Sequence, residues 1–211
     1  MKGVYLVTDS RLCGERGVAD TVAEAVRGGT GWVQLREKTA GTRSFVETAL
    51  ALKAVLAPTG VPLIVNDRID VALAASADGV HIGQNDMPYP MARKLMGPDA
   101  IIGLSVETWQ DVEAAQELDV AYLGVSPVFA TPTKTDTKAP WGLDGLARIR
   151  AFSRHPLVGI GGIGTGNAAE VVQAGAGCIA VVSAICAAKD PFEATRALCR
   201  AIEKAPPHDN G

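Results

Sequence analysis

Short apolar segments alternate with segments of helical periodicity along this 211-residue sequence. Apolar runs typical of buried strands fall at residues 4–9, 32–37, 62–67, 79–83, 100–106, 121–127, 156–162 and 177–185. Between them, apolar residues recur at helical spacing in segments such as 19–29, 43–57, 109–118 and 166–176. Eight units of about 26 residues predict an α/β protein with a compact (β/α)8 TIM barrel, and a doubly wound sheet is the alternative.

The composition indicates a single globular domain. No linker or low-complexity tract divides the chain, so residues 1–204 are expected to form one barrel domain, with a frayed polar tail at 205–211. A net charge of -3 without a basic run argues against a nucleic-acid surface. No apolar run reaches the roughly 18 residues of a membrane span, and the start of the chain lacks the apolar stretch of a signal peptide. We therefore expect a cytoplasmic protein with small-molecule partners, whose four cysteines, which show no C-x-x-C pairing, are free thiols.

The second predicted strand carries an amide and two cations at alternate positions. Gln34, Arg36 and Lys38 would share one face of this strand. In a barrel, polar groups near the carboxyl end of a strand emerge at the mouth, where the loops build active sites. Two cations there indicate an anionic ligand. The alternative is that they are surface charges paired with nearby acids such as Glu37.

Carboxylates follow the next two predicted strands. Asn66 and Asp67 end the third strand, and Asp86 lies just beyond the fourth. Two carboxylates beside two cations suit a magnesium ion that also binds a phosphate, because magnesium takes few protein ligands and keeps water and substrate oxygens. The alternatives are a helix cap for Asp67 and a turn residue for Asp86. We favour the metal, and we interpret His81 as a hydrogen-bonded core residue.

Two later loops offer groups that bind phosphate. The loop 126–140 is rich in hydroxyls and contains Thr131, Thr133 and Lys134, although a solvated linker is the alternative. The run "GIGGIG" fits a dinucleotide motif, but the next strand ends in "VVSAI" without the acidic residue such a site requires. In a barrel, Gly162 and Ser183 would follow strands seven and eight, where phosphates commonly bind, and close packing by glycine is the alternative.

The segments "QLREK", "VNDR", "GVHIGQNDMP", "FATPTKTD", "GIGGI" and "VVSAI" together resemble the thiamine-phosphate synthase family. The resemblance covers almost the whole chain, and the combination of segments is specific although each is short. It implies a transferase that joins hydroxymethylpyrimidine diphosphate to a thiazole phosphate, carboxylated or hydroxyethyl-substituted, and releases diphosphate. It also implies Mg2+ as cofactor and a homodimer as the assembly.

The resemblance assigns roles residue by residue. It implies that Asp67 and Asp86 hold the metal and that Arg36, Lys38 and Lys134 act on the diphosphate as catalytic groups. The pyrimidine diphosphate site would also contain Gln34, Asn66 and Ser105. The thiazole phosphate would be bound by Thr131, Thr133, Gly162, Val182 and Ser183. Glu107 departs from the family pattern and receives no role.

The chemistry of this reaction suits the residue types. An aminopyrimidine spreads positive charge, so its diphosphate-bearing methylene can ionise, and the enzyme chiefly needs to stabilise the departing anion. No covalent nucleophile is required. Three alternatives stay open: a related thiazole tautomerase, a sugar-phosphate isomerase or epimerase that would need a general base, and a phosphate-binding regulator. The two metal-type carboxylates disfavour the tautomerase and the regulator.

Overall fold

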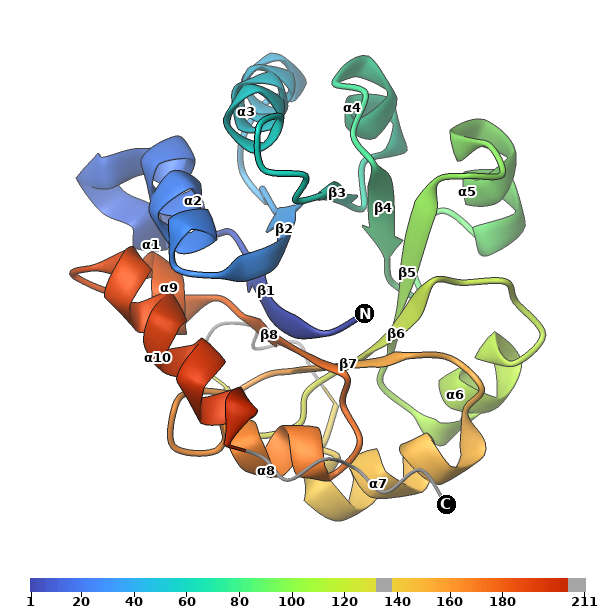
Figure 1. Cartoon of the computed structure of the whole chain (residues 1–211). Helices are drawn as coiled ribbons and strands as arrows, with labels where there is room; N and C mark the ends of the chain where they lie inside the picture. The colour runs from blue at the N-terminus through green and yellow to red at the C-terminus, as the bar shows by residue number, and fades with distance from the viewer. Residues whose placement is uncertain (132–137, 205–211) are drawn as a thin grey trace.

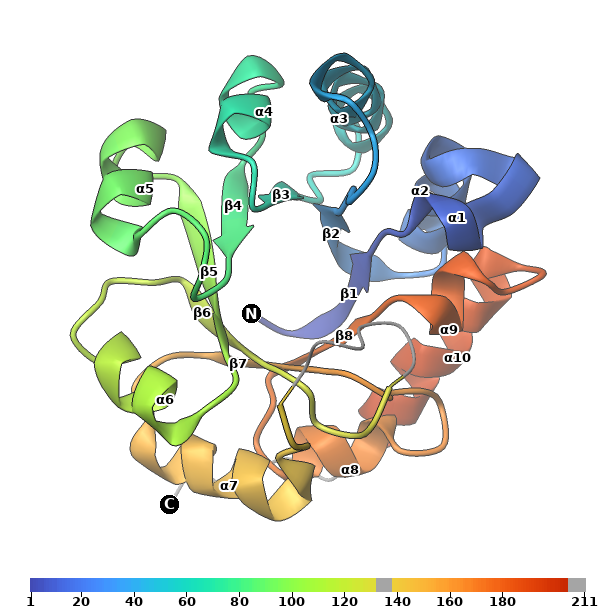
Figure 2. The ribbon, with the colours of Figure 1, turned by 180° about the vertical axis from the view of Figure 1, so that it is seen from behind.

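The computed structural model describes residues 1–131 and 138–204, and within these ranges eight parallel strands close into a barrel surrounded by helices (Figures 1 and 2). The strands follow one another around the barrel in chain order: β1 (Gly3–Val7), β2 (Thr30–Leu35), β3 (Leu63–Asn66), β4 (Gly79–Ile82), β5 (Ile101–Val106), β6 (Tyr122–Val125), β7 (Leu157–Ile160) and β8 (Cys178–Val181). The barrel closes because β1 pairs directly with β8. The predicted TIM barrel is confirmed, and the doubly wound alternative is excluded.

Helical segments follow the strands and form the outer layer. They are α1 (Ser10–Cys13), the 3-10 turn η1 (Gly14–Arg16), α2 (Gly17–Arg27), α3 (Thr42–Leu56), α4 (Ile69–Ala74), α5 (Tyr89–Met96), α6 (Trp109–Ala115), α7 (Gly142–Phe152), α8 (Ala168–Gln173), α9 (Ser183–Cys186) and α10 (Pro191–Glu203). Side chains satisfy the first free N–H groups of some of them. Asp190 accepts from Glu193 N at α10, and Thr108 and Asp111 form a capping box at α6.

Seven of the eight predicted strands end one to four residues earlier in the structure, and two of these differences concern the site. β2 stops at Leu35, so Arg36 and Lys38 lie in the loop just beyond it rather than within the strand. The apolar run predicted as one strand over 177–185 divides into β8 and the short helix α9. Periodicity cannot separate a buried strand from the buried helix that follows it, because both are continuously apolar.

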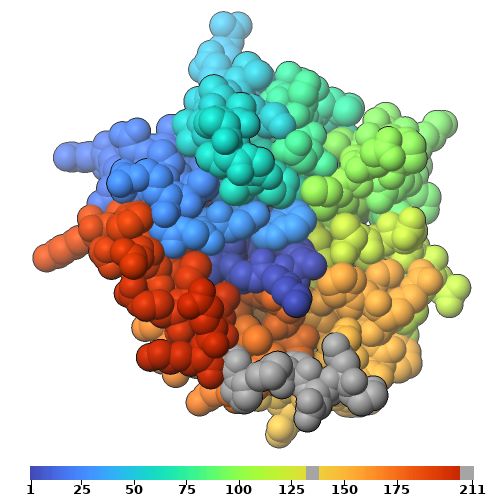
Figure 3. All heavy atoms as spheres, in the orientation of Figure 1, coloured from blue at the N-terminus to red at the C-terminus, as the bar shows by residue number. Residues whose placement is uncertain are grey.

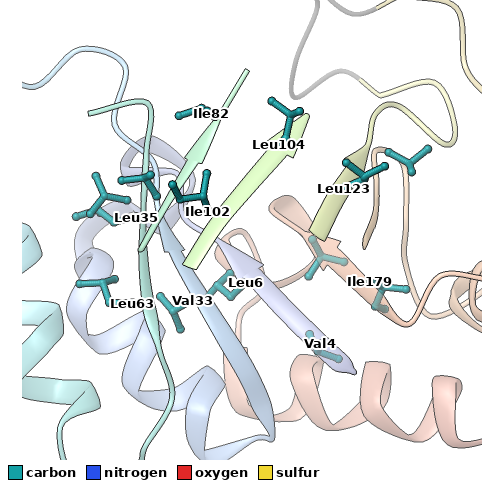
Figure 4. Close-up of a cluster of buried hydrophobic side chains, with 14 of the residues drawn as sticks. Val4, Leu6, Val33, Leu35, Leu63, Ile82, Ile102, Leu104, Leu123 and Ile179 are labelled. Atoms are coloured by element: carbon teal, nitrogen blue, oxygen red, sulfur yellow. The ribbon is translucent and has the colours of Figure 1, made fainter. Parts of the chain in front are cut away.

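The core has two shells, because successive strand residues point to opposite faces of the barrel wall. The outer shell lies between wall and helices and includes Val4, Leu6, Val33, Leu35 and Leu63, which Figure 4 shows along neighbouring strands. The inner shell fills the barrel itself. It consists of Tyr5, Val7, Ile64, Tyr122, Val158, Cys178 and Ala180. Two of its largest members carry hydroxyl groups, so the barrel interior is partly polar.

The two ends of the barrel differ in what covers them. At the amino ends of the strands, the first residues pack across the opening, where a Cβ on Gly177 would lie 2.7 Å from Met1 O. Figure 3 shows this segment filling the centre of that face. The opposite end carries the polar residues that follow the strands.

The four cysteines form no disulfide in the described residues, which include all of them. Cys13, Cys178 and Cys186 are buried free thiols and Cys199 is a partly buried one, so the prediction of free cysteines is confirmed. Within residues 1–131 and 138–204, every helix is too short or too polar to cross a membrane. The predicted tail 205–211 lies outside the described residues.

Candidate active site

A pocket of about 540 Å³ lies at the carboxyl ends of the strands. It is lined by every predicted site residue that the structure describes, and these lie at the ends of seven successive strands, β2 to β8, or in the loops that follow them: Gln34, Arg36, Lys38, Asn66, Asp67, Asp86, Ser105, Thr131, Gly162, Val182 and Ser183. Thr133 and Lys134 lie outside the described residues. Residues spread over 150 positions of sequence therefore meet in one cavity, because parallel strands present their carboxyl ends on the same face.

Two carboxylates that influence each other line this pocket. Asp67, directly after β3, adopts a left-handed backbone with φ 62°, and its N–H donates to His81 O at 2.9 Å. Asp86 Oδ2 accepts from Gly83 N at 2.7 Å. Burial, and then the neighbouring carboxyl of Asp67, raise the pKa of Asp86. Such crowding of like charges favours a bound cation.

The structure distinguishes the two alternative roles, a helix cap for Asp67 and a turn residue for Asp86. The residue at the N-cap of α4 is Arg68, and that helix shows no side-chain capping bond, so Asp67 does not cap it. Asp86 does act as a turn residue, because its side chain and its backbone N–H both bond to Gly83. The turn leaves the second carboxylate oxygen of Asp86 for other partners.

The cations beyond β2 lie on the same rim. Lys38 Nζ donates to Asp67 Oδ2 at 2.8 Å, and the lysine side chain stays half exposed. Lys38 thus pairs across strands with a proposed metal ligand and not with its neighbour Glu37. The backbone N–H of Arg36 donates to Thr8 Oγ1 at 3.1 Å, which fixes the chain where this side chain enters the pocket.

A chain of hydrogen bonds forms the floor of the pocket. Gln34 Nε2 donates to Tyr5 OH at 2.9 Å, and Tyr5 OH lies 2.9 Å from Tyr122 OH. Tyr122 OH lies 3.0 Å from His81 Nδ1, and His81 Nε2 lies 2.8 Å from Ser105 Oγ. Burial is the main cause that raises the pKa of both tyrosines, so both phenols stay neutral. The prediction that His81 is a hydrogen-bonded core residue is confirmed, although its ring also borders the pocket.

Tyr5 and Tyr122 were not predicted as pocket residues. Each alternates along its strand with aliphatic residues that point outward, such as Val4 and Leu6 beside Tyr5, and this pattern indicates an inward side chain. The sequence signal for a polar role was a hydroxyl group at an inward strand position. That signal alone does not reveal the hydrogen-bond partners of the hydroxyl.

The glycines after β7 serve two purposes. At Gly159, a Cβ would lie 2.8 Å from Val171 Cγ1, so this glycine allows close packing of strand and helix, as the alternative predicted. Gly162 has φ 66°, and a Cβ there would lie 2.8 Å from Ala130 O. The loop after β7 therefore passes close against the loop after β6, and both line the same side of the pocket.

Known proteins resemble this chain along nearly its full length. A family model described as thiamine monophosphate synthase matches residues 4–185. A thiamine-phosphate synthase of Albidiferax ferrireducens is 59% identical over 200 residues, which cover 95% of this chain and 91% of that protein. A thiamine-phosphate synthase of Leptospira biflexa is 52% identical over 202 residues, covering 94% and 96%.

A solved structure agrees with these sequences. The thiamine phosphate pyrophosphorylase from Pyrococcus furiosus superposes with a TM-score of 0.87 at 37% identity, covering 97% of each chain. The family model spans most of the barrel, and the relatives match at high identity from end to end. The chain belongs to the thiamine-phosphate synthase family of transferases.

Proposed function

We propose that this chain joins hydroxymethylpyrimidine diphosphate to a thiazole phosphate, forming thiamine phosphate and releasing diphosphate. One observation beyond family membership carries the proposal. The basic residues after β2, the carboxylate pair after β3 and β4, and the glycine loop after β7 all line one pocket. A reaction between two phosphorylated substrates needs two anion sites in one pocket, placed so that the reacting carbon and nitrogen atoms meet.

The carboxylate pair fits magnesium. Asp67 and Asp86 line the same pocket and Asp67 raises the pKa of Asp86, while no group of three or more His, Cys, Asp or Glu that could hold a metal occurs in the described part of the chain. Magnesium commonly binds one or two carboxylates and completes its shell with water and substrate phosphates, so two ligands suffice. When bound, the ion would neutralise charge on the diphosphate.

We assign the pyrimidine diphosphate to the side of the pocket formed by β2 to β5. Arg36 and Lys38 would bind the diphosphate oxygens, joined by Lys134 from the loop after β6. Gln34, Asn66 and Ser105 would contact the pyrimidine. The thiazole phosphate would lie on the opposite side, against Thr131, Thr133, Gly162, Val182 and Ser183.

The proposed reaction is a dissociative substitution. The bond between the pyrimidine methylene and the diphosphate oxygen breaks, and the electron pair leaves with diphosphate. The lone pair of the thiazole nitrogen then forms the new carbon–nitrogen bond. Arg36, Lys38 and Lys134 stabilise the charge that grows on the leaving group, and the pocket holds the two substrates in line. The residues need no covalent nucleophile.

A diphosphate-release assay tests this function. Purified protein with both substrates and magnesium should release one diphosphate for each thiamine phosphate formed, and should release none when either substrate is omitted. A tautomerase, a sugar-phosphate isomerase and a non-catalytic regulator would all fail to release diphosphate, so that result would overturn the proposal. A homodimer in the cytoplasm completes the proposal, and sedimentation of the purified protein tests the assembly.

A further inference from the structure

The hydrogen-bonded chain at the floor of the pocket links two residues that we assign to the pyrimidine, Gln34 and Ser105. The three residues between them, Tyr5, Tyr122 and His81, have no role in the function proposed above. They come from β1, β6 and β4, so the hydrogen-bonded chain crosses the interior of the barrel. Each of the two phenols and the Gln34 side chain is less than 5% exposed.

The hydrogen-bonded chain at the pocket floor has a direction. Gln34 Nε2 can only donate, so Tyr5 OH accepts from it and directs its own proton to Tyr122 OH. Tyr122 OH, once it accepts from Tyr5, has its own proton left for His81 Nδ1, which lies 3.0 Å away. A neutral imidazole whose Nδ1 accepts carries its proton on Nε2, and that proton is donated to Ser105 Oγ.

This direction fixes what the two ends offer to a ligand. Ser105 Oγ accepts from His81, so the proton of the serine hydroxyl is directed to another acceptor, and Ser105 lines the pocket. At the other end, the amide nitrogen of Gln34 is engaged by Tyr5, which leaves its amide oxygen as an acceptor. An aminopyrimidine carries the complementary groups, an amino donor and ring nitrogen acceptors.

We propose that Tyr5, Tyr122 and His81 are positioning residues that set the hydrogen-bond polarity of the pocket floor, so that Ser105 donates to a ring nitrogen of the aminopyrimidine. They act through Gln34 and Ser105 and do not themselves bond to the substrate. The inference rests on the proposed function for the identity of the ligand, but the direction of the chain is a property of the free protein.

The barrel is built to hold these rings in place. A Cβ at Gly103 would lie 2.1 Å from Tyr122 Cζ, and a Cβ at Gly124 would lie 2.9 Å from His81 Cε1. Neighbouring strands thus carry glycine where the two rings need space. His81 stacks on Tyr122 with an interplanar angle of 21° and ring centroids 5.5 Å apart.

Simple filling of the core does not account for the hydroxyl groups. Phenylalanine at positions 5 and 122 would occupy nearly the same volume without burying an oxygen that needs partners. Buried polar networks are costly when partly satisfied, whereas a fully connected one specifies a single arrangement. A defined arrangement at the floor of a binding pocket is useful because it decides which ligand groups are matched.

The direction can be measured without substrate. Nitrogen-15 NMR of histidine-labelled protein distinguishes the two neutral tautomers, and His155→Gln and His208→Gln variants assign the His81 signals. We expect His81 to be protonated at Nε2 in the wild type. Tyr122→Phe should shift its Nδ1 resonance, because that nitrogen loses its donor. A His81 protonated at Nδ1 in the wild type would overturn the proposal.

Kinetics test the consequence for the ligand. Tyr122→Phe should raise the Michaelis constant for the pyrimidine diphosphate roughly 5- to 10-fold, the effect of a neutral hydrogen bond, and leave that for thiazole phosphate unchanged. Tyr5→Phe should also raise the Michaelis constant for the pyrimidine diphosphate. It replaces Tyr122→Phe as the test variant if Tyr122→Phe does not fold. Tyr89→Phe is the matched control, because Tyr89 OH donates to Asp119 O away from the pocket.

A double-mutant cycle separates positioning from general damage. In a Ser105→Ala background, Tyr122→Phe should add little, because the residue through which it acts is gone. Independent, multiplying effects of the two changes would refute the proposal even if each alone weakens binding. If the wild type releases no diphosphate at all, the proposed function fails. The tautomer of His81 still decides the direction of the hydrogen-bonded chain in that case.

Discussion

Lys38 Nζ lies 2.8 Å from Asp67 Oδ2, so a proposed diphosphate-binding cation is paired with a proposed metal ligand. In the free protein this pair neutralises one of the two carboxylates that follow β3 and β4. The pair is partly exposed, so it contributes little to stability and is easily rearranged. The same two side chains can therefore turn to a metal and a phosphate when these arrive.

The first prediction concerns the carboxylates. Asp67→Asn and Asp86→Asn should each lower activity at limiting magnesium by at least about tenfold, because even residues that only support a metal ligand cost about 10- to 100-fold. Diphosphate release measured across a magnesium titration gives the result. Asp70→Asn is the control, since Asp70 pairs with Arg68 outside the pocket. Near-normal activity of both variants at limiting magnesium would remove the metal assignment.

The second prediction separates the two anion sites. Lys38→Ala should weaken use of the pyrimidine diphosphate, whereas Ser183→Ala should mainly raise the Michaelis constant for thiazole phosphate, by roughly 5- to 10-fold for one lost hydrogen bond. Initial rates with each substrate varied in turn provide both constants. If both variants affect both substrates equally, the division of the pocket into two sites is wrong.

The third prediction asks whether Arg36 acts on leaving-group charge. Arg36→Lys keeps the charge but loses the planar fork of donors that matches phosphate oxygens. Because that charge grows toward the transition state, turnover and catalytic efficiency should fall together by about tenfold or more, the effect of losing a charge-assisted hydrogen bond. Steady-state kinetics at saturating thiazole phosphate decide it, with exposed Arg43→Lys as control. A raised Michaelis constant with unchanged turnover would reduce Arg36 to an anchor for the substrate.

The fourth prediction uses the buried phenols. Burial raises the pKa of Tyr5 and Tyr122 in the folded state, whereas in the unfolded chain tyrosine titrates near pH 10. Below that pH both states are protonated and the stability is fully present. Above it only the unfolded chain loses these protons, so the free energy of unfolding should fall by up to about 1.4 kcal/mol per pH unit for each phenol.

Urea unfolding between roughly pH 8 and pH 11 measures this loss. Replacing both residues by phenylalanine should make the decline with pH shallower, whatever the change in absolute stability. Parallel curves for the wild type and the double variant would mean that the two phenols ionise in the native barrel as readily as in the unfolded chain.

The sequence was sufficient for the barrel and for much of the pocket. Alternating strand and helix patterns leave few topologies, and polar residues at successive strand ends must meet at one face of a parallel barrel. For that reason Asp67 and Ser183 could be placed in the same pocket although 116 positions separate them in the chain.

Contacts across the barrel could not be predicted in the same way. Which of two inward residues touch depends on the register and tilt of strands far apart in the chain, and this fixes the contact of Tyr5 with Tyr122. The pairing of Lys38 with Asp67 rather than Glu37 depends equally on loop geometry. Gly103 and Gly124 could be recognised only once the rings they accommodate were known.

The inner shell of the barrel is at the same time the floor of the pocket, since Tyr5, Tyr122, Val158 and Ala180 belong to both. Any change of ligand preference at this depth must also repack the core, and overpacking or cavities there cost the fold several kcal/mol. On the acceptor side, Thr131 is only partly buried and Ser183 is exposed, and both lie outside the two shells of the core. Laboratory evolution toward new substrates is therefore expected to alter the acceptor side through loop substitutions and insertions, while the pyrimidine side resists change.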